Sequence, residues 1–385
     1  MRLFHPSIVL LIGIPLSLLL VSRADASRVG ANSQLIKPEA RSYGMGLAFT
    51  AIAEGPAAGF WNPAALGLNS GFWLGKSEAQ LVPDLADDIW MRGKHFTLSA
   101  GGIGFAFYRN YLDYGKSPIT TDSPDIDGSF DSYEYINSFG LGVDLKHLGL
   151  FADNDNMQAA LGANYRYFKV DLVAGHTIPE IEVPAADTWD LDLGAMWTGH
   201  LPLPEFTIEV PPLFSGLSSP DGSRYSSIGL RGGLVVKNVL AHEITFIDDE
   251  VVSPLGRFLH TGIAAEATLQ SLPPFAHIVR VLVAWDRQSI MEPDIDWVEN
   301  YRGFEINLLG IFSYRRGYID DPDGDITDST EGHGFGFDFM FENWLFTRLG
   351  FAYDYADVPQ AADLDRVDKE SYSLWFDLNW DLITN

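Results

Sequence analysis

The stretch "SYSLWFDLNWDL", residues 371–382, decides the fold because its composition changes at every step. Every second position carries a large apolar residue: Tyr372, Leu374, Phe376, Leu378, Trp380 and Leu382. Ser, Asp and Asn, with one Trp, stand between them. In an extended chain, successive side chains point to opposite faces, so this stretch is predicted to be a strand with one apolar and one largely polar face.

The same alternation recurs along the chain, at 189–197, 333–341 and 349–355. These stretches are longer than the strands of about five or six residues usual in soluble sheets. A soluble sandwich also alternates, but it displays Lys and Glu on its outer face. Here one face carries large aromatics and the other mixes Asp, Arg, Asn and Gly. The pattern predicts an all-β fold, a transmembrane antiparallel outer-membrane β-barrel.

Counting strands depends on which connections are long. Five long acidic segments are assigned to the outside: 109–131, 173–186, 288–300, 319–331 and 356–369. With both chain ends on the periplasmic side, this assignment predicts about 14 strands over residues 70–385. One of them is predicted to begin near residue 95, and Gly101 and Gly102 are expected to lie within a strand. Twelve strands is the alternative, because Gly310 is either a turn or a kink within one strand and 199–223 is long for a periplasmic connection.

The N-terminus reads as a secretory signal peptide, residues 1–26. Arg2 precedes an apolar run over residues 8–21, and Ala24-Asp25-Ala26 is a cleavage site before Ser27. An uncleaved membrane anchor is the alternative, but the run is shorter than the ~20 residues that a spanning helix needs. The expected location is the bacterial cell outer membrane.

Composition and motifs exclude several functions. The chain has no Cys, which excludes disulfides and Cys-based metal or redox sites, and a net charge of −27, which argues against nucleic acid as a partner. Its nine histidines form no catalytic motif. "GFWLGKS" (71–77) has three residues between its glycines where a phosphate-binding loop has four. No enzyme activity and no cofactor are predicted.

One acidic stretch, "DDPDGDITDSTE" (320–331), has spacing that suits a metal. Asp321, Asp323 and Asp325 recur at every second residue, as oxygen ligands of Ca²⁺ often do. The alternative is a solvated acidic loop. A further role for such loops is bridging through divalent ions to lipopolysaccharide phosphates.

A compact segment precedes the first strand, over residues 27–69. Asn62 is placed to cap a helical turn that begins at Pro63, where the missing N–H of proline costs nothing. Many Gly and Ala residues allow close packing against a barrel wall, so the segment is predicted to be a plug inside the lumen. The alternative is a periplasmic tail, which would be more polar than this segment. Its candidate plug and lumen residues are Phe49, Phe60, Trp61, Asn62, Pro63 and Ala64.

This segment also carries a resemblance. "ARSYGMGLAFTAIAEGPAAGFWNPAALG" (40–67) resembles the N-terminal signature of PorV/PorQ-type outer-membrane proteins, within the wider FadL-like barrel superfamily. It departs from the pattern at Leu47 and Ala65, where glycines are usual. "VVKNVLAHEITFID" (235–248) and "SPLGRFLHTGIA" (253–264) resemble a second family motif, with Val239-Leu240 in place of its glycine turn.

The resemblance implies a fourteen-stranded barrel with its N-terminal segment in or beneath the lumen, and two alternative functions. PorV/PorQ-type proteins imply a component of type IX-like protein secretion, with secretion-machinery proteins and exported cargo as partners. FadL-like proteins imply a passive channel for uptake of hydrophobic small molecules. The first is the closer match in signature. Outer-membrane lipid and lipopolysaccharide are expected partners in both.

Overall fold

A computed structural model describes residues 30–83, 85–120, 126–150, 156–174, 185–203, 206–207, 223–224, 226–246, 251–270, 277–292, 297–341, 346–361 and 364–378. The predicted signal peptide (1–26) lies outside the described residues, as does its cleavage site. The last predicted strand residues, Trp380 and Leu382, also lie outside them.

The helices are short: η1 (Asn32–Gln34), α2 (Ala40–Gly44), α3 (Ala58–Trp61), α4 (Ala65–Leu68) and η2 (Leu145–Leu148). None of the helices in the described ranges has the length and apolar character needed to cross a membrane. The strands are β1 (Gly71–Gln80), β2 (Trp90–Ala100), β3 (Ile103–Thr120), β4 (Ile126–Asp144), β5 (Met157–Ala174), β6 (Ala186–Pro202), β7 (Phe206–Thr207), β8 (Ser223–Arg224), β9 (Ser226–Lys237), β10 (Glu243–Phe246), β11 (Val251–Pro254), β12 (Phe258–Gln270), β13 (His277–Ile290), β14 (Val298–Leu308), β15 (Phe312–Asp321), β16 (Ile326–Met340), β17 (Phe346–Val358) and β18 (Val367–Leu378).

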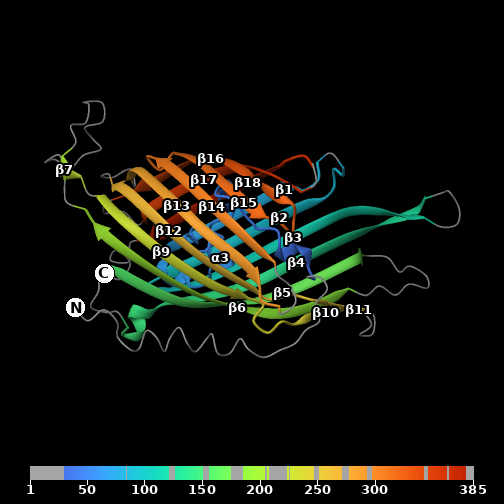
Figure 1. Cartoon of the computed structure of the whole chain (residues 1–385). Coiled ribbons are helices and arrows are strands. Elements are labelled where there is room, and N and C mark those ends of the chain that lie inside the picture. Colours follow the sequence, from blue (N-terminus) through green and yellow to red (C-terminus); the bar gives the residue numbers. More distant parts are fainter. Residues whose placement is uncertain are drawn as a thin grey trace.

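Fourteen of these strands form one closed antiparallel barrel (Figure 1), in the order β1-β18-β17-β16-β15-β14-β13-β12-β9-β6-β5-β4-β3-β2. Two small hairpins, β7–β8 and β10–β11, stand apart from this barrel. Closure pairs β1 with β18 and leaves no free sheet edge, which satisfies the backbone hydrogen bonds that a bilayer cannot. The predicted fold class is confirmed, with fourteen strands rather than twelve.

Two glycine turns explain where the strand boundaries fall. The strand predicted to begin near residue 95 begins at Ile103, because Gly101 and Gly102 have positive φ and form a two-residue turn between β2 and β3. The expectation that these two glycines lie within a strand was therefore wrong. Leu309 and Gly310 also have positive φ, so the chain turns there and does not merely kink.

Two of the predicted outer loops are mostly strand. β3 and β4 occupy most of 109–131 and extend beyond the rest of the barrel (Figure 1). Their outward tyrosines stabilise this extension: the Tyr111 and Tyr133 rings stack with centroids 5.5 Å apart. β15 and β16 likewise occupy most of 319–331 and leave only a short turn. Acidic composition alone did not distinguish loops from strands here, because a barrel strand that continues beyond the bilayer carries polar residues on both faces.

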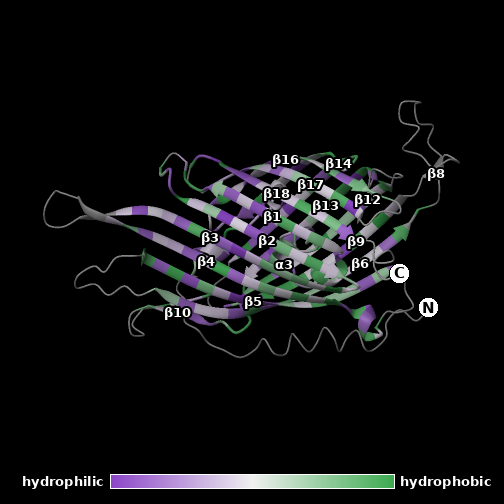
Figure 2. Ribbon diagram, turned by 180° about the vertical axis from the view of Figure 1, so that it is seen from behind, coloured by the Kyte–Doolittle hydropathy of each residue, from purple (hydrophilic) through white to green (hydrophobic). Residues whose placement is uncertain are grey.

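The two faces of the wall differ as the alternation predicts. Figure 2 shows hydrophobic and hydrophilic residues interleaved along the strands. The outer surface exposes large apolar side chains around the barrel, among them Leu98, Phe105, Leu141, Leu193, Leu230, Ile263, Phe337, Phe351 and Leu374. The inner face buries polar side chains, among them His95, Asn110, Asn164, Asp192, Asp286, Glu305 and Asp354. An apolar outside with a polar inside is the arrangement of a barrel in lipid.

The lipid-facing assignment predicts unequal costs for one substitution at two adjacent positions. Leu374 lies on the outer face, paired with Leu74 and Phe351, and Ser373 faces the lumen. Leu374→Arg is expected to destabilise the barrel by about 2–4 kcal/mol, because the guanidinium enters the apolar belt, and Ser373→Arg by much less. Urea unfolding of the two variants in lipid vesicles measures the difference. Equal costs would contradict the assignment.

The N-terminal residues 30–69, named the plug from here, lie inside the barrel. The plug is the blue segment enclosed by strands in Figure 1. Helix α2 packs against β15 to β18, and α4 packs against β2 to β5. Plug residues such as Met45, Phe49, Ile52 and Leu66 are fully buried and belong to the main hydrophobic core. The core of this protein is thus the contact between the plug and the inner wall.

Candidate functional site

A chamber of about 1160 Å³ lies beside the plug at the end of the barrel opposite the start of β1, and is named the apolar chamber here. The plug contributes Leu35, Ile36, Tyr43 and Leu47 to its lining. The strands contribute Ile290, Tyr301, Ile319, Ile326, Val358 and Val367. Since most of these side chains are aliphatic or aromatic, the chamber suits an apolar molecule.

Polar groups interrupt this lining, and besides the residues described next they include Asn32, Asp321, Asp323 and Gln360. Lys37 of the plug donates from Nζ to Gln288 Oε1 at 3.3 Å. The Nζ of Lys369 lies 3.9 Å from the centroid of the Tyr43 ring. Both lysines line the chamber together with Glu299. A small number of polar groups on an otherwise apolar lining is what orients a ligand with one polar end.

A second chamber, of about 560 Å³, lies on the opposite side of the plug and is named the charged chamber. Its lining contains Arg41 and Glu54 of the plug, together with Arg280, Glu305 and Arg315 of the wall. Residues near the start of β1 and the turn at Gly310 also line it, which places it toward the end of the barrel where β1 begins. The plug therefore separates a mainly apolar chamber from one that contains a cluster of ion pairs.

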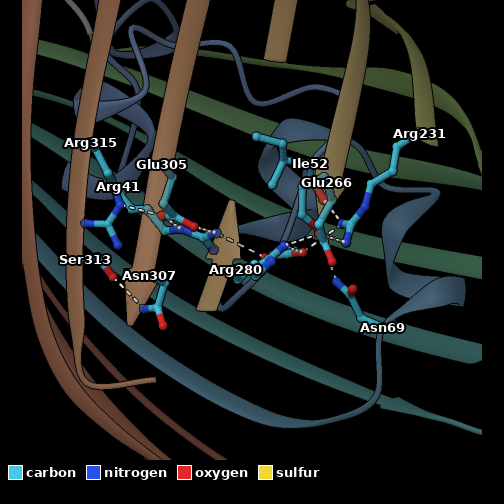
Figure 3. Close-up of polar contacts among 12 residues, drawn as sticks. Arg41, Ile52, Asn69, Arg231, Glu266, Arg280, Glu305, Asn307, Ser313 and Arg315 are labelled. Atoms are coloured by element: carbon cyan, nitrogen blue, oxygen red, sulfur yellow. Dashed lines mark hydrogen bonds and ion pairs between the residues drawn. The ribbon is translucent and has the colours of Figure 1, made fainter. Parts of the chain in front are cut away.

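Ion pairs join the plug to the wall of the charged chamber (Figure 3). Glu54 accepts from Arg231 at 2.7 Å and from Arg41 at 3.1 Å, and also pairs with Arg280. Arg41 in turn donates to Glu305 at 2.9 Å. Three guanidinium groups thus surround the single carboxylate of Glu54. Because each pair joins side chains with limited exposure, these pairs are screened less than surface pairs.

The same network sets the protonation of Glu54. Burial alone would raise its pKa, but the charges of Arg280, Arg231 and Arg41 outweigh burial and hold the pKa of this carboxyl well below its ordinary value. Glu54 is therefore ionised at neutral pH, and the network carries its full charge.

The candidate aromatic residues of the plug form one cluster. Trp61 lies between Phe49, at 5.5 Å between ring centroids, and Phe60, at 5.7 Å. Phe60 also contacts Tyr108 of β3, edge to face, at 5.5 Å. The backbone N–H groups of Phe49 and Thr50 donate to Asp286 of β13 at 2.8 and 2.6 Å. The cluster thus packs two parts of the plug together and ties them to the wall.

Asn62, Pro63 and Ala64 lie in the turn between α3 and α4. Asn62 Oδ1 accepts from the Ala64 N–H at 3.1 Å, which is the hydrogen bond expected of the predicted cap, but α4 begins at Ala65 and not at the predicted Pro63. Its Nδ2 donates to the backbone oxygens of Thr50 at 3.3 Å and Ala195 at 3.1 Å. Asn62 therefore joins the turn, the rest of the plug and strand β6.

This turn lies on a row of glycines in the wall, which the sequence analysis did not identify. Gly104, Gly142, Gly162 and Gly194 occupy directly paired positions on four adjacent strands, β3 to β6. A Cβ at Gly162 would meet the backbone of Pro63 at 2.3 Å, and one at Gly194 would meet Asn62 Oδ1 at 2.3 Å. Only a wall without side chains at this height allows the turn to lie there.

Glycines of the opposite wall receive the earlier part of the plug. Gly233 and Gly262 are paired, and a Cβ on Gly233 would meet the backbone oxygen of Thr50 at 2.4 Å. Gly303 and Gly317 are also paired, and a Cβ on Gly303 would meet the backbone oxygen of Met45 at 2.2 Å. The signal for both sets was present in the sequence as glycines at inward positions of the alternating stretches.

Asn238, in the second family-like motif, contacts the plug from the loop end. It has a positive φ of 54° and is fully buried. Its Nδ2 donates to Gln34 Oε1 at 2.8 Å and to the backbone oxygen of Gly256 at 2.7 Å. It thus turns the chain after β9, where the usual glycine turn is missing, and holds the first helical turn of the plug.

The three aspartates considered for Ca²⁺ are not assembled into a metal site in the described ranges. No group of three His, Cys, Asp or Glu residues there is arranged to hold a metal ion. Asp321, at the end of β15, accepts from the Gly324 N–H at 2.8 Å and from Trp297 Nε1 at 3.3 Å. Asp323 and Asp325 lie in the turn to β16, where Asp325 has a positive φ. Asp321 therefore stabilises this turn by accepting the Gly324 N–H.

Comparisons with known proteins identified solved structures only. No family model and no curated protein matches the chain. A FadL homologue from Pseudomonas aeruginosa is 8% identical, with a TM-score of 0.41, over 89% of this chain and 98% of its own. The CymD monoaromatic hydrocarbon channel is 10% identical, with a TM-score of 0.40, over 89% and 97%. The toluene transporter TodX from P. putida is 10% identical, with a TM-score of 0.37, over 88% and 96%. These neighbours include FadL-type barrels, and nothing in them supports the PorV/PorQ part of the resemblance.

Proposed function

We propose that this barrel is an outer-membrane channel for hydrophobic small molecules, with the plug controlling passage. The observation that carries the proposal is the apolar chamber, because it is large, lies in the lumen and has the plug as part of its lining. A molecule entering from the loop end would meet aliphatic and aromatic side chains first. Lys37 and Lys369 would hold a polar end if the molecule has one.

The polar groups of the charged chamber, which lies on the other side of the plug from the apolar chamber, support a gating role for the plug. The charged chamber presents ion pairs beside its apolar lining residues, so it holds an apolar molecule less favourably than the apolar chamber does while the plug stays in place. The described strands form a closed ladder, so the proposed route runs along the lumen and requires the plug to shift.

Filling the apolar chamber is expected to weaken ligand binding. Ile319 is buried on β15 and lines the chamber, so Ile319→Trp places an indole in the space that the ligand would use. We expect the affinity for the fluorescent apolar probe N-phenyl-1-naphthylamine to fall by about tenfold, equivalent to ~1.4 kcal/mol. Fluorescence titration of the purified barrel measures binding, and probe entry into intact cells producing the barrel measures passage.

Tyr318→Trp is the matched control, since Tyr318 is the neighbouring residue and points outward. It should leave binding and passage unchanged. An equal affinity for the Ile319→Trp and wild-type proteins would show that the chamber does not hold the probe, and would overturn the proposal.

The secretion-associated function implied by the PorV/PorQ resemblance stays a prediction from the N-terminal motif. We do not propose it as a second function, because the apolar chamber has the size and lining of a small-molecule site, which supports the channel. Co-purification of exported proteins with the barrel from outer membranes would favour secretion instead.

A further inference from the structure

Three cations stand side by side on the outer surface of strands β1, β2 and β3. Lys76 is directly paired with Lys94, and Lys94 is directly paired with Arg109. Their register places all three on the same face as the exposed apolar residues Leu74, Leu98 and Phe105. These three residues are named the basic row. Directly opposed residues on neighbouring strands have Cβ atoms about 4.5–5.5 Å apart, so the three side chains leave the wall close to one another.

The basic row marks the level where the apolar belt ends. On each strand the next outward residue toward the start of β1 is apolar: Leu74, Phe96 and Phe107. The residues beside the row are polar or aromatic. Lys76 pairs with Tyr372 of β18, and the Arg109 guanidinium lies 4.3 Å from the centroid of the Tyr135 ring. Tyrosines and cations at the edge of an apolar belt are typical of the headgroup level of a bilayer.

Like charges in direct opposition destabilise a sheet, so the basic row needs a reason. Acidic neighbours offset only part of the repulsion among these cations. Lys76 pairs with Glu78 at 2.7 Å, and the nearby Arg92 pairs with Asp113 at 3.1 Å. Within the described part of the chain, the side chain of Lys94 at the centre of the row makes no hydrogen bond and no ion pair. An anion located between these three side chains would remove the repulsion and accept their hydrogen bonds.

The anion must come from the membrane, because the row faces lipid. The protein itself carries a net charge of −27 and supplies few cations, yet three are opposed at one level on adjacent strands. We propose that the basic row binds the phosphate groups of a phosphorylated lipid of the outer leaflet. The contact is direct, and it is distinct from bridging by divalent ions through acidic loops. It is independent of the proposed channel function.

The test compares two triple variants of the full-length barrel. Lys76→Gln with Lys94→Gln and Arg109→Gln removes the row. Arg287→Gln with Arg302→Gln and Arg316→Gln removes three outward cations of β13 to β15, which are not directly opposed to one another. Binding of bisphosphorylated lipid A is measured in detergent by native mass spectrometry, with EDTA present. We expect affinity to fall by about tenfold or more for the first variant and to stay within about twofold for the second.

Three further arms complete the experiment. Dephosphorylated lipid A should bind the wild-type protein and the row variant equally weakly. Inorganic phosphate at the same concentration should not displace the lipid, since the proposal requires the acyl chains to lie on the apolar belt. If loss of heat-modifiable mobility shows that the triple row variant does not fold, the single variant Lys94→Gln is measured in its place. An equal loss in both triple variants, an unchanged affinity in the row variant, or binding that disappears with EDTA would each overturn the proposal.

Discussion

Glu54→Gln is expected to loosen the plug while the barrel remains closed. The substitution removes the carboxylate shared by Arg41, Arg231 and Arg280, and leaves Glu266 paired with Arg231 and Arg280 and Glu305 paired with Arg41. Breaking a buried ion pair by removing one partner costs about 3–5 kcal/mol. Glu54 is 20% exposed to the charged chamber, so water compensates part of the loss and we expect the lower end of this range. The substitution weakens the contact between the plug and the wall. The hydrogen-bonded ladder of barrel strands stays intact, because Glu54 takes no part in it.

Two measurements separate the plug from the barrel. Heat-modifiable mobility on gels reports the closed ladder and should be unchanged. Single-channel conductance in planar bilayers reports the lumen and should rise as the plug shifts. Asp328→Asn is the control, because it breaks an exposed pair with Arg366, and such pairs contribute about 0–1 kcal/mol. If Glu54→Gln behaves like this control in both measurements, the network does not hold the plug.

The protonation of Glu54 adds a pH dependence with a defined sign. Its folded pKa lies well below the ordinary value of 4.5, so its contribution is complete above that value and is lost only as the pH falls through the folded pKa. The wild-type protein should therefore keep a low conductance from neutral pH down to about pH 4.5 and lose it only in stronger acid. A rise in conductance between pH 7 and pH 5 would exclude Glu54 as the controlling group.

The alternation in the sequence correctly predicted which strand residues point outward and which point into the lumen, because this orientation depends only on the local backbone. A residue two positions from Leu374 points to the same side whatever the rest of the chain does. The turn at Asn62-Pro63 was predictable for the same reason, since a cap and the residues it serves are adjacent. Strand boundaries were less certain, because a pair such as Gly101-Gly102 is compatible with a strand or a turn.

The glycine row and the ion network were not predictable because they are assembled across the barrel. Gly104 and Gly194 come together only through the register of four strands. Glu54 and Arg280 are 226 residues apart in the sequence. Polar residues on inward faces were visible in the sequence, but a single chain without register does not say which inward residues share a level. The apolar chamber escaped prediction for the same reason.

The glycine row leads to the last prediction, because it allows the turn around Asn62 to lie directly on the wall. Replacing Trp61 and Asn62 together by Ala removes the packing and the hydrogen bonds that hold this turn. Trp61 is 1% exposed, and truncating a buried Trp costs about 3–5 kcal/mol. Losing the Asn62 cap costs about 1 kcal/mol more, and its two bonds to Thr50 and Ala195 are lost as well.

The double substitution is again expected to weaken the contact between the plug and the wall. Fourteen strands keep their ladder, so heat-modifiable folding should survive the double substitution. The turn would leave the glycine row and open space along β4 to β6, which should raise conductance to small hydrophilic solutes and abolish selective passage of the apolar probe. Pro63→Gly is the milder control in the same turn, since it acts through the unfolded chain by about 0.4–1 kcal/mol. Unchanged conductance and unchanged probe passage in the double variant would mean that residues 30–69 only lead into the first strand and do not control the lumen.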